Sequence, residues 1–270
     1  MVASPLDVLR FTSCQAPNAE PALTAIMRFV GEQIGMPLEF KLDVPWQDRL
    51  AMLDAGTLHA AWICGLPYIR RADQPEPSIE LLMAPVMRGE RYQGRPIYFS
   101  DVVVRADSRY RHFDDLRGAR WAFNERGSHS GYNVMCWHLA THGLNGDYFG
   151  GVIGSGSHQR SLRMILDGEI DASAIDSTVL ETELRHDPSL AARIRRLEPL
   201  GPSPIPPWVV NRSLAPQVRE QVRQAFLTLH EDSRGRELLA AGDYARFVGV
   251  MDEDYDRLRE MTRLAQVVSL

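Results

Sequence analysis

The chain has 270 residues and a formal net charge of −5 at pH 7. An acidic balance argues against a nucleic-acid-binding protein, which normally carries a basic surplus, but local dipoles can still bind a small anion. Apolar residues make up 44% of the chain and charged residues 24%, which is typical of a globular protein large enough for one large domain or two lobes.

Short apolar strands alternate with amphipathic helices along the first hundred residues. We expect helices over 21–34 and 46–55, and strands over 8–12, 38–44, 59–64, 79–87 and 97–104. This alternation is typical of an α/β protein with largely parallel sheets.

The pattern restarts after Phe113. The expected strands are 120–123, 151–153, 170–175 and 208–210, and the expected helices are 132–140, 159–166, 178–184, 215–230 and 252–267. A turn region is expected near 235–242, and Arg193 to Arg196 is interpreted as a charged, solvated helix end.

A proline-rich segment, Gly201–Pro207, forces an extended, non-helical path. Together with the extended segment near 97–105, it predicts a chain that crosses from one lobe to a second and returns. The first lobe is then expected to comprise 1–100 plus 206–270, including the C-terminal helices, and the second lobe 101–205. A ligand is expected in the cleft between the lobes.

The most informative stretch is Asn124–Tyr132, which follows a strand and opens a helix. Gly127 and Gly131 let the backbone turn tightly and approach a ligand, and Ser128 or Ser130 can cap the helix. Unpaired N–H groups and the positive end of the helix dipole favour a phosphate-like anion. An ordinary capped helix would give the same Ser-x-Ser-Gly pattern, so the neighbouring segments decide the interpretation.

No run of about eighteen apolar residues predicts a membrane span, and the N-terminus lacks the basic and apolar regions of a secretory signal. We therefore expect a periplasmic protein if a signal segment has been removed, and a cytoplasmic one otherwise. The three cysteines have no metal-like or Cys-x-x-Cys spacing, so neither a disulfide framework nor a metal site is expected.

Taken together, several separated segments resemble the phosphate, phosphite and phosphonate substrate-binding proteins of ABC importers, within the type II periplasmic-binding-protein fold. The resemblance runs from about residue 6 to about residue 250, and the motifs match in order as well as in spacing. They are Tyr98–Arg105, Asp114–Arg120, Gly127–Tyr132, Gly156–His158, Asp167–Ala172 and Pro204–Pro206. The resemblance implies two lobes, each a mixed, mainly parallel sheet flanked by helices, joined by two crossover strands.

The resemblance also implies site residues in the second lobe and at the first crossover strand. Ser128, His129 and Ser130 match the phosphonyl-binding loop, which usually reads Ser-Thr-Ser-Gly, so His129 is a departure that leaves the exact anion open. His158 matches the histidine of a second loop that faces the phosphorus group, and Tyr98 matches a tyrosine whose hydroxyl reaches the ligand.

Two further positions have weaker matches. Trp46 stands where many relatives carry an aromatic residue, and it either walls the cleft or packs the lobe. Asp176 could hold a ligand ammonium group, but the second crossover carries Pro206 and Pro207 where a partner acid would be needed. The missing acid argues against a zwitterionic ligand, because a buried ammonium requires compensation.

The function implied is non-enzymatic: a monomeric binding protein that captures a small phosphorus oxyanion for an ABC permease, without cofactor, metal or nucleic acid. One alternative is a cofactor-free cytosolic enzyme on the same scaffold that acts on a small organic acid, with His129, His158 and Asp176 as acid–base groups. Another alternative is a ligand-sensing module.

Overall fold

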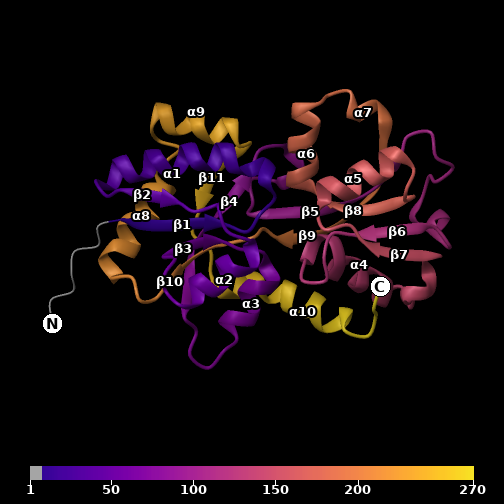
Figure 1. Ribbon diagram of the computed structural model, residues 1–270, viewed down its shortest axis with the longest axis horizontal. Helices are drawn as coiled ribbons and strands as arrows, with labels where there is room; N and C mark the ends of the chain where they lie inside the picture. Colours follow the sequence, from indigo (N-terminus) through magenta and orange to yellow (C-terminus); the bar gives the residue numbers. More distant parts are fainter. Residues whose placement is uncertain (1–7) are drawn as a thin grey trace. The chain divides into compact units, whose positions relative to one another are not determined.

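The computed structural model describes residues 8–270 (Figure 1), which form two compact units. Unit 1 contains the described residues up to Pro96 together with Ile205–Asp254. Unit 2 contains Ile97–Pro204 together with Tyr255–Leu270. The chain therefore passes between the units three times, and the C-terminal segment belongs to unit 2.

Unit 1 is built on a six-stranded sheet in the order β11-β4-β10-β3-β1-β2. Its strands are β1 (Leu9–Ser13), β2 (Leu38–Phe40), β3 (Ala60–Trp62), β4 (Ile79–Met87), β10 (Trp208–Asn211) and β11 (Tyr244–Val248). Its helices are α1 (Glu20–Ile34), α2 (Trp46–Asp54), α3 (Gly65–Ala72), α8 (Pro216–Leu227) and α9 (Ser233–Ala241). Strand β1 pairs in parallel with β2 and β3, whereas β10 and β11 pair antiparallel with their neighbours.

The core of unit 1 forms where alternate strand residues meet the apolar face of a helix. Helix α1 buries Leu23, Ile26 and Phe29 and ends at Gly35, whose φ of 65° is the left-handed conformation that glycine adopts at low cost. Trp208 of β10 stacks on Trp62 of β3 with ring centroids 6.1 Å apart.

Three elements of unit 1 were not expected: α3, α9 and β11. The turn predicted near 235–242 is wrong, because α9 occupies it. Asp232 caps α9 by accepting a hydrogen bond from the Gly235 N–H at 2.9 Å. Gly235 is needed there because a Cβ would overlap the carbonyl of Leu229, so this glycine serves close packing inside a helix and does not end one.

Unit 2 is built on a five-stranded sheet in the order β7-β6-β8-β5-β9. Its strands are β5 (Ile97–Arg105), β6 (Arg120–Phe123), β7 (Gly151–Gly154), β8 (Ala172–Asp176) and β9 (Ile194–Pro204). Its helices are α4 (Val134–Thr141), α5 (His158–Asp167), α6 (Ser177–His186), α7 (Leu190–Arg193) and α10 (Asp256–Ala265). Strands β7, β6 and β8 are parallel, whereas β5 runs antiparallel to β8 and β9. Both units are thus α/β with mixed sheets, as expected, although antiparallel pairs are more frequent than predicted.

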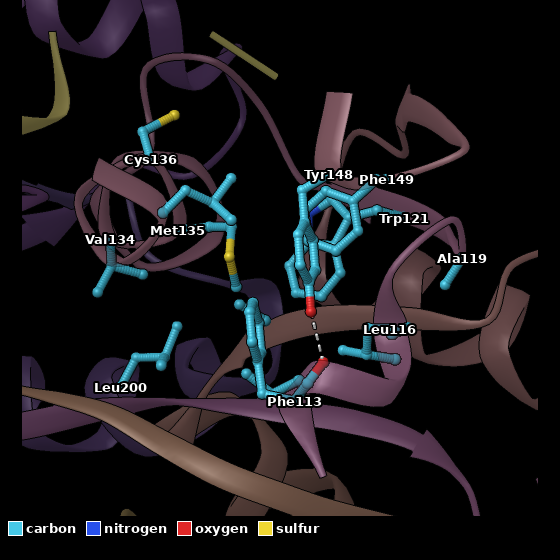
Figure 2. Close-up of a cluster of buried hydrophobic side chains, with 14 of the residues drawn as sticks. Phe113, Leu116, Ala119, Trp121, Val134, Met135, Cys136, Tyr148, Phe149 and Leu200 are labelled. Atoms are coloured by element: carbon cyan, nitrogen blue, oxygen red, sulfur yellow. Dashed lines mark hydrogen bonds between the residues drawn. The ribbon is translucent and has the colours of Figure 1, made fainter. Parts of the chain in front are cut away.

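One buried cluster in the core of unit 2 is rich in aromatic side chains (Figure 2). Trp121 stacks on Phe149 with ring centroids 4.6 Å apart, and Phe113 stacks on Tyr148 at 5.3 Å. The Tyr148 hydroxyl donates a hydrogen bond of 2.9 Å to the Phe113 carbonyl, so its polar end is satisfied inside the core.

Two expectations for unit 2 are corrected. The segment from Ile194 is strand β9, not a helix end, because it pairs along β5. Helix α10 does not complete the first lobe: Met261 and Ala265 join Val134 and Leu139 of α4 in the core of unit 2. None of the helices within residues 8–270 is long and apolar enough to span a membrane.

Candidate functional site

Three loops of unit 2 leave the same edge of its sheet. Strands β7, β6 and β8 are parallel neighbours, so the loops that follow their carboxyl ends lie together, where open α/β sheets bind ligands. The loops after β6 and β7 are tied by backbone hydrogen bonds of 2.8 Å, from the Ser155 N–H to the Phe123 carbonyl and from the Gly156 N–H to the Asn124 carbonyl. The two loops therefore form one surface.

Each of these loops ends in a polar residue that caps the next helix. Ser128 accepts from the Gly131 N–H at 3.2 Å, and Ser157 accepts from the Arg160 N–H at 3.1 Å. Asp176 accepts from the Thr178 N–H at 2.9 Å. A cap satisfies one or two of the four free N–H groups of a first turn, so other donors remain for a ligand.

The predicted anion loop forms a π-helical turn, η4 (His129–Asn133), in which the Asn133 N–H donates to the Ser128 carbonyl at 3.1 Å. Such turns are rare and occur frequently at functional sites. A Cβ on Gly131 would overlap Asn124 Oδ1 and lie 3.1 Å from His158 Cε1, whereas nothing lies within 4 Å of a Cβ on Gly127. The close approach at Gly131 is therefore made by the protein's own Asn124 and His158.

His129 uses both ring nitrogens inside unit 2. Nδ1 lies 3.0 Å from Asn133 Nδ2, and Nε2 lies 2.9 Å from Ser203 Oγ. The Asn133 amide nitrogen can only donate, so Nδ1 accepts and the proton sits on Nε2. The side chain is 1% exposed, and burial lowers the pKa of His129 to about 3. The ring is therefore neutral and already fully hydrogen-bonded.

Ser130 and His158 form a buried pair. Ser130 Oγ lies 2.9 Å from His158 Nε2, and the Asn124 amide nitrogen lies 3.4 Å from the same atom. Burial lowers the pKa of His158 to about 4, although interaction with the Ala174 backbone opposes part of this shift. His158 Nδ1 and Asn124 Oδ1 are buried without a hydrogen-bond partner that meets distance and angle criteria.

Asp176 is committed to capping α6. Its Oδ1 accepts from both the N–H and the hydroxyl of Thr178, at 2.9 and 2.8 Å. Burial, with a smaller contribution from Asp101, raises the pKa of Asp176 to about 6, against the effect of the Thr178 hydrogen bonds. Asp101 itself is buried and pairs with Arg196, with Oδ2 to Nε at 3.4 Å.

The structure brings most of the predicted site residues together within unit 2. Ser130 contacts His158, Ser128 caps the same turn, and Tyr98 lies beside His129 with ring centroids 6.3 Å apart. Asp176 stands at the neighbouring strand end. Trp46 is half-buried at the start of α2 in unit 1, so its predicted role remains a prediction.

Sequence reasoning missed three polar partners: Asn124, Asn133 and Ser203. Asn133 could have been found, because it stands four residues after His129 and side chains at that spacing share a helix face. Ser203 could not, because it lies 74 residues beyond His129 and only the pairing of β9 with β5 brings it near.

Solved solute-binding proteins of ABC transporters share this fold of two α/β units with mixed sheets. A binding-protein component of an ABC phosphonate transporter from Pseudomonas aeruginosa has 16% identity and a TM-score of 0.83, over 96% of this chain and 86% of that one. PhnD1 from Prochlorococcus marinus, in complex with methylphosphonate, has 17% identity and a TM-score of 0.83, over 97% and 99%. The alkanesulfonate-binding protein SsuA from Xanthomonas axonopodis pv. citri, bound to MOPS, has 16% identity and a TM-score of 0.65, over 99% and 96%.

The family of periplasmic substrate-binding proteins of phosphonate ABC transporters matches residues 11–255 of this chain. The chain belongs to that family. The resemblance seen in the sequence is thereby confirmed, together with the class of protein that it implied: a transporter solute-binding protein.

Proposed function

We propose that this protein binds a small phosphorus oxyanion at the strand-end loops of unit 2 and presents it to an ABC permease in the periplasm. The observation that best supports this proposal is that three polar side chains, those of Ser128, Ser130 and His158, lie at adjacent helix starts and are each less than 10% exposed. Hydroxyl, imidazole and backbone N–H donors in a low-dielectric site stabilise an anion far more than the same groups in water.

The Ser130–His158 pair can supply this chemistry without a cation. The Asn124 amide nitrogen can only donate, so His158 Nε2 accepts from it and from the Ser130 hydroxyl, and on binding the serine proton turns from Nε2 to an anion oxygen. The Ser128 hydroxyl already accepts from the Gly131 N–H, so its proton is likewise available. We therefore propose that both serines donate to the anion and that His158 orients Ser130.

His129 plays a different part in this proposal. Both of its ring nitrogens are engaged with Asn133 and Ser203, so we assign the side chain to holding the turn in place. The contribution of this residue to the anion then comes through its backbone N–H, which lies in the first turn after the Ser128 cap.

The proposed ligand lacks an ammonium group. Asp176, the acid considered for that role, is occupied as a helix cap, and burial favours its neutral form. The second crossover offers Pro206 and Pro207 in place of an acid. A simple alkylphosphonate, phosphite or phosphate is compatible with these groups, and the Prochlorococcus neighbour of the same fold was solved with methylphosphonate.

The enzyme alternative is less well supported. Ser130 and His158 are within hydrogen-bond distance, but His158 Nδ1 makes no hydrogen bond to a carboxylate of the described residues, whereas the base of a serine nucleophile is normally oriented by such a group. A histidine whose pKa is about 4 is also a weak base at neutral pH. We propose a binding role without turnover.

Isothermal titration calorimetry and thermal shift test the proposal, with methylphosphonate, phosphite, phosphate, aminoethylphosphonate, sulfate and acetate as ligands. We expect methylphosphonate, phosphite or phosphate to bind and aminoethylphosphonate to bind more weakly than methylphosphonate. Removing two charge-assisted hydrogen bonds of about 1.5–3 kcal/mol each in Ser128→Ala/Ser130→Ala should weaken binding by roughly 10²–10⁴-fold.

Ser189→Ala is the matched control, because Ser189 is an exposed serine of unit 2 that contacts only Asp187 through its side chain. The control should bind like the parent protein. A response to acetate alone, or unchanged methylphosphonate binding in the double variant, would contradict the proposal.

A further inference from the structure

The loops after β6, β7 and β8, which carry Ser128, Ser130 and His158, are called the serine loops below. Unit 2 also carries a hollow of about 390 Å³ at the opposite edge of its sheet from these loops. It is lined by Arg105 at the end of β5, Arg120 at the start of β6, and Asp171 immediately before β8, together with Ser108, Arg109 and Tyr110 of the loop after β5. We call this hollow the arginine pocket. The serine loops follow the opposite ends of β6 and β8, so at least the length of a strand, roughly 13 Å, separates the two places.

The lining of the arginine pocket is positively charged in a chain whose net charge is −5. Arg105, Arg109 and Arg120 face a single lining carboxylate, Asp171. Asp107 also neutralises Arg105, with Oδ1 and Oδ2 each 2.8 Å from a guanidinium nitrogen. Three guanidinium groups against these two carboxylates leave one uncompensated positive charge.

Two of the three arginines have structural duties. Arg120 binds Asp171 in a bidentate pair, at 3.1 and 3.0 Å, and donates to the carbonyls of Gly168 and Glu169, which closes this edge of the sheet. Arg105 binds Asp107 through Nε and Nη2 only, so the N–H groups of its Nη1 remain available.

Arg109, in contrast, is not paired with a carboxylate among the described residues in the way that Arg105 and Arg120 are. Its side chain is exposed, and its guanidinium lies 5.2 Å from the centroid of the Tyr110 ring. No carboxylate within residues 8–270 forms an ion pair with it. A guanidinium presents five donors in a planar fork that suits phosphate and carboxylate oxygens, and here that fork borders a hollow of the size of small-molecule sites.

The loop that carries Arg109 is held in place from behind. Arg195 of β9 donates to the carbonyls of Ala106 and Tyr110, the latter at 3.0 Å, and Arg111 donates to the carbonyl of Ser108. Tyr110 is buried. The loop is therefore ordered before any ligand arrives, which reduces the entropic cost of binding.

From this geometry we propose that the arginine pocket is a second anion site, distinct from the serine loops, that binds a small polyvalent phosphate compound through Arg109 and Nη1 of Arg105. A polyvalent anion is favoured because two guanidinium groups, those of Arg105 and Arg109, line the same pocket and can each bind a separate oxyanion group. The proposal does not depend on the ligand assigned to the serine loops.

Calorimetry with inorganic tripolyphosphate tests the proposal, at constant ionic strength set with sodium chloride, in the Ser128→Ala/Ser130→Ala background. Arg109→Gln should weaken binding at least tenfold, the loss of about one charge-assisted contact. Arg263→Gln, which alters an exposed arginine of α10 outside the pocket, should leave the affinity unchanged. Circular dichroism verifies that each variant is folded. If the Ser128→Ala/Ser130→Ala protein is unstable, the same arginine variants are compared in the parent protein saturated with methylphosphonate.

Asp107→Asn is expected to raise the affinity for tripolyphosphate, whereas Arg109→Gln is expected to lower it, so the proposal is tested in both directions. Asp107 is exposed, and removing its charge frees the Arg105 fork, so tripolyphosphate should bind severalfold more tightly. Equal affinity of Arg109→Gln and the background protein would overturn the proposal. An affinity that stays the same or falls in Asp107→Asn would overturn it as well, because an added net positive charge at an anion site must strengthen binding.

Discussion

The strand-end loops of the two units are stabilised by different means. In unit 2, the helices that follow β6, β7 and β8 begin at Ser128, Ser157 and Asp176, and each side chain accepts a backbone hydrogen bond. In unit 1, the helices α1, α2 and α3 begin after Ala19, Pro45 and Cys64, and none of these residues makes a side-chain cap.

Unit 1 relies on a buried cation. Arg49 of α2 is buried and donates to three carbonyls, those of Ser13 at 2.5 Å, Leu42 at 2.6 Å and Val44 at 2.7 Å. It thereby joins the end of β1 to the loop before α2. The difference teaches that unit 2 orders its loops through local side-chain caps, which leave the hydroxyl protons of Ser128 and Ser157 for a ligand, whereas unit 1 orders its loop carbonyls through one guanidinium.

The largest effect is expected from a substitution that removes the hydrogen bonds of Arg49 to the loop carbonyls of unit 1. Arg49→Met should lower the free energy of unfolding by about 3 kcal/mol, because three partly buried carbonyls lose a charged donor. Urea unfolding of the ligand-free protein measures the change, and Arg28→Gln, at an exposed position of α1, should have almost no effect. A loss below about 1 kcal/mol would show that water replaces the guanidinium and that Arg49 does not organise these loops.

The next effect concerns the turn in unit 2. Gly131→Ala places a methyl group against Asn124 and His158, so we expect it to destabilise the protein by about 2 kcal/mol and to abolish anion binding. Gly127→Ala is a matched control, because the added methyl group meets open space. Thermal unfolding and calorimetry compare the two variants. Similar behaviour of both would mean that the turn is not held by the Asn124 and His158 contacts.

The smallest effect is a pH dependence. The folded-state pKa values of His129 and His158, about 3 and about 4, lie below the ordinary value of 6.5. The unfolded chain therefore binds more protons between about pH 6.5 and pH 4, and stability falls as the pH falls through this window. Asp176, with its raised pKa of about 6, opposes this trend, because its native carboxyl takes up a proton before the unfolded one does.

His129→Gln isolates one of these groups. Glutamine keeps a donor and an acceptor but does not titrate, so the stability of the variant should fall less steeply, by about 1.4 kcal/mol per pH unit below pH 6.5. Chemical unfolding at pH 7, 5.5 and 4.5 measures the slope. The same slope in variant and parent would mean that His129 is protonated in the native state.

Much of the fold could be predicted from local patterns. Strands 79–87 and 120–123 were placed at the bounds that β4 and β6 have, because apolar runs flanked by turn residues carry that information within a few residues. The loop after β6 was also identified locally, since Ser128 caps the turn at which the helix was expected to begin. Helices α3 and α9 were missed because proline and glycine in their first turns resemble breakers, although proline is tolerated there.

The sequence by itself therefore determined the α/β class, the family motifs and the serines at a helix start, all of which depend on residues close together in the chain. Only the tertiary structure decided that His129 binds Ser203, that α10 packs on α4 of unit 2, and that Arg105, Arg109 and Arg120 border one hollow. These juxtapositions depend on strand pairing and on the burial of apolar faces, which select partners many residues apart among many alternatives that the local pattern permits equally.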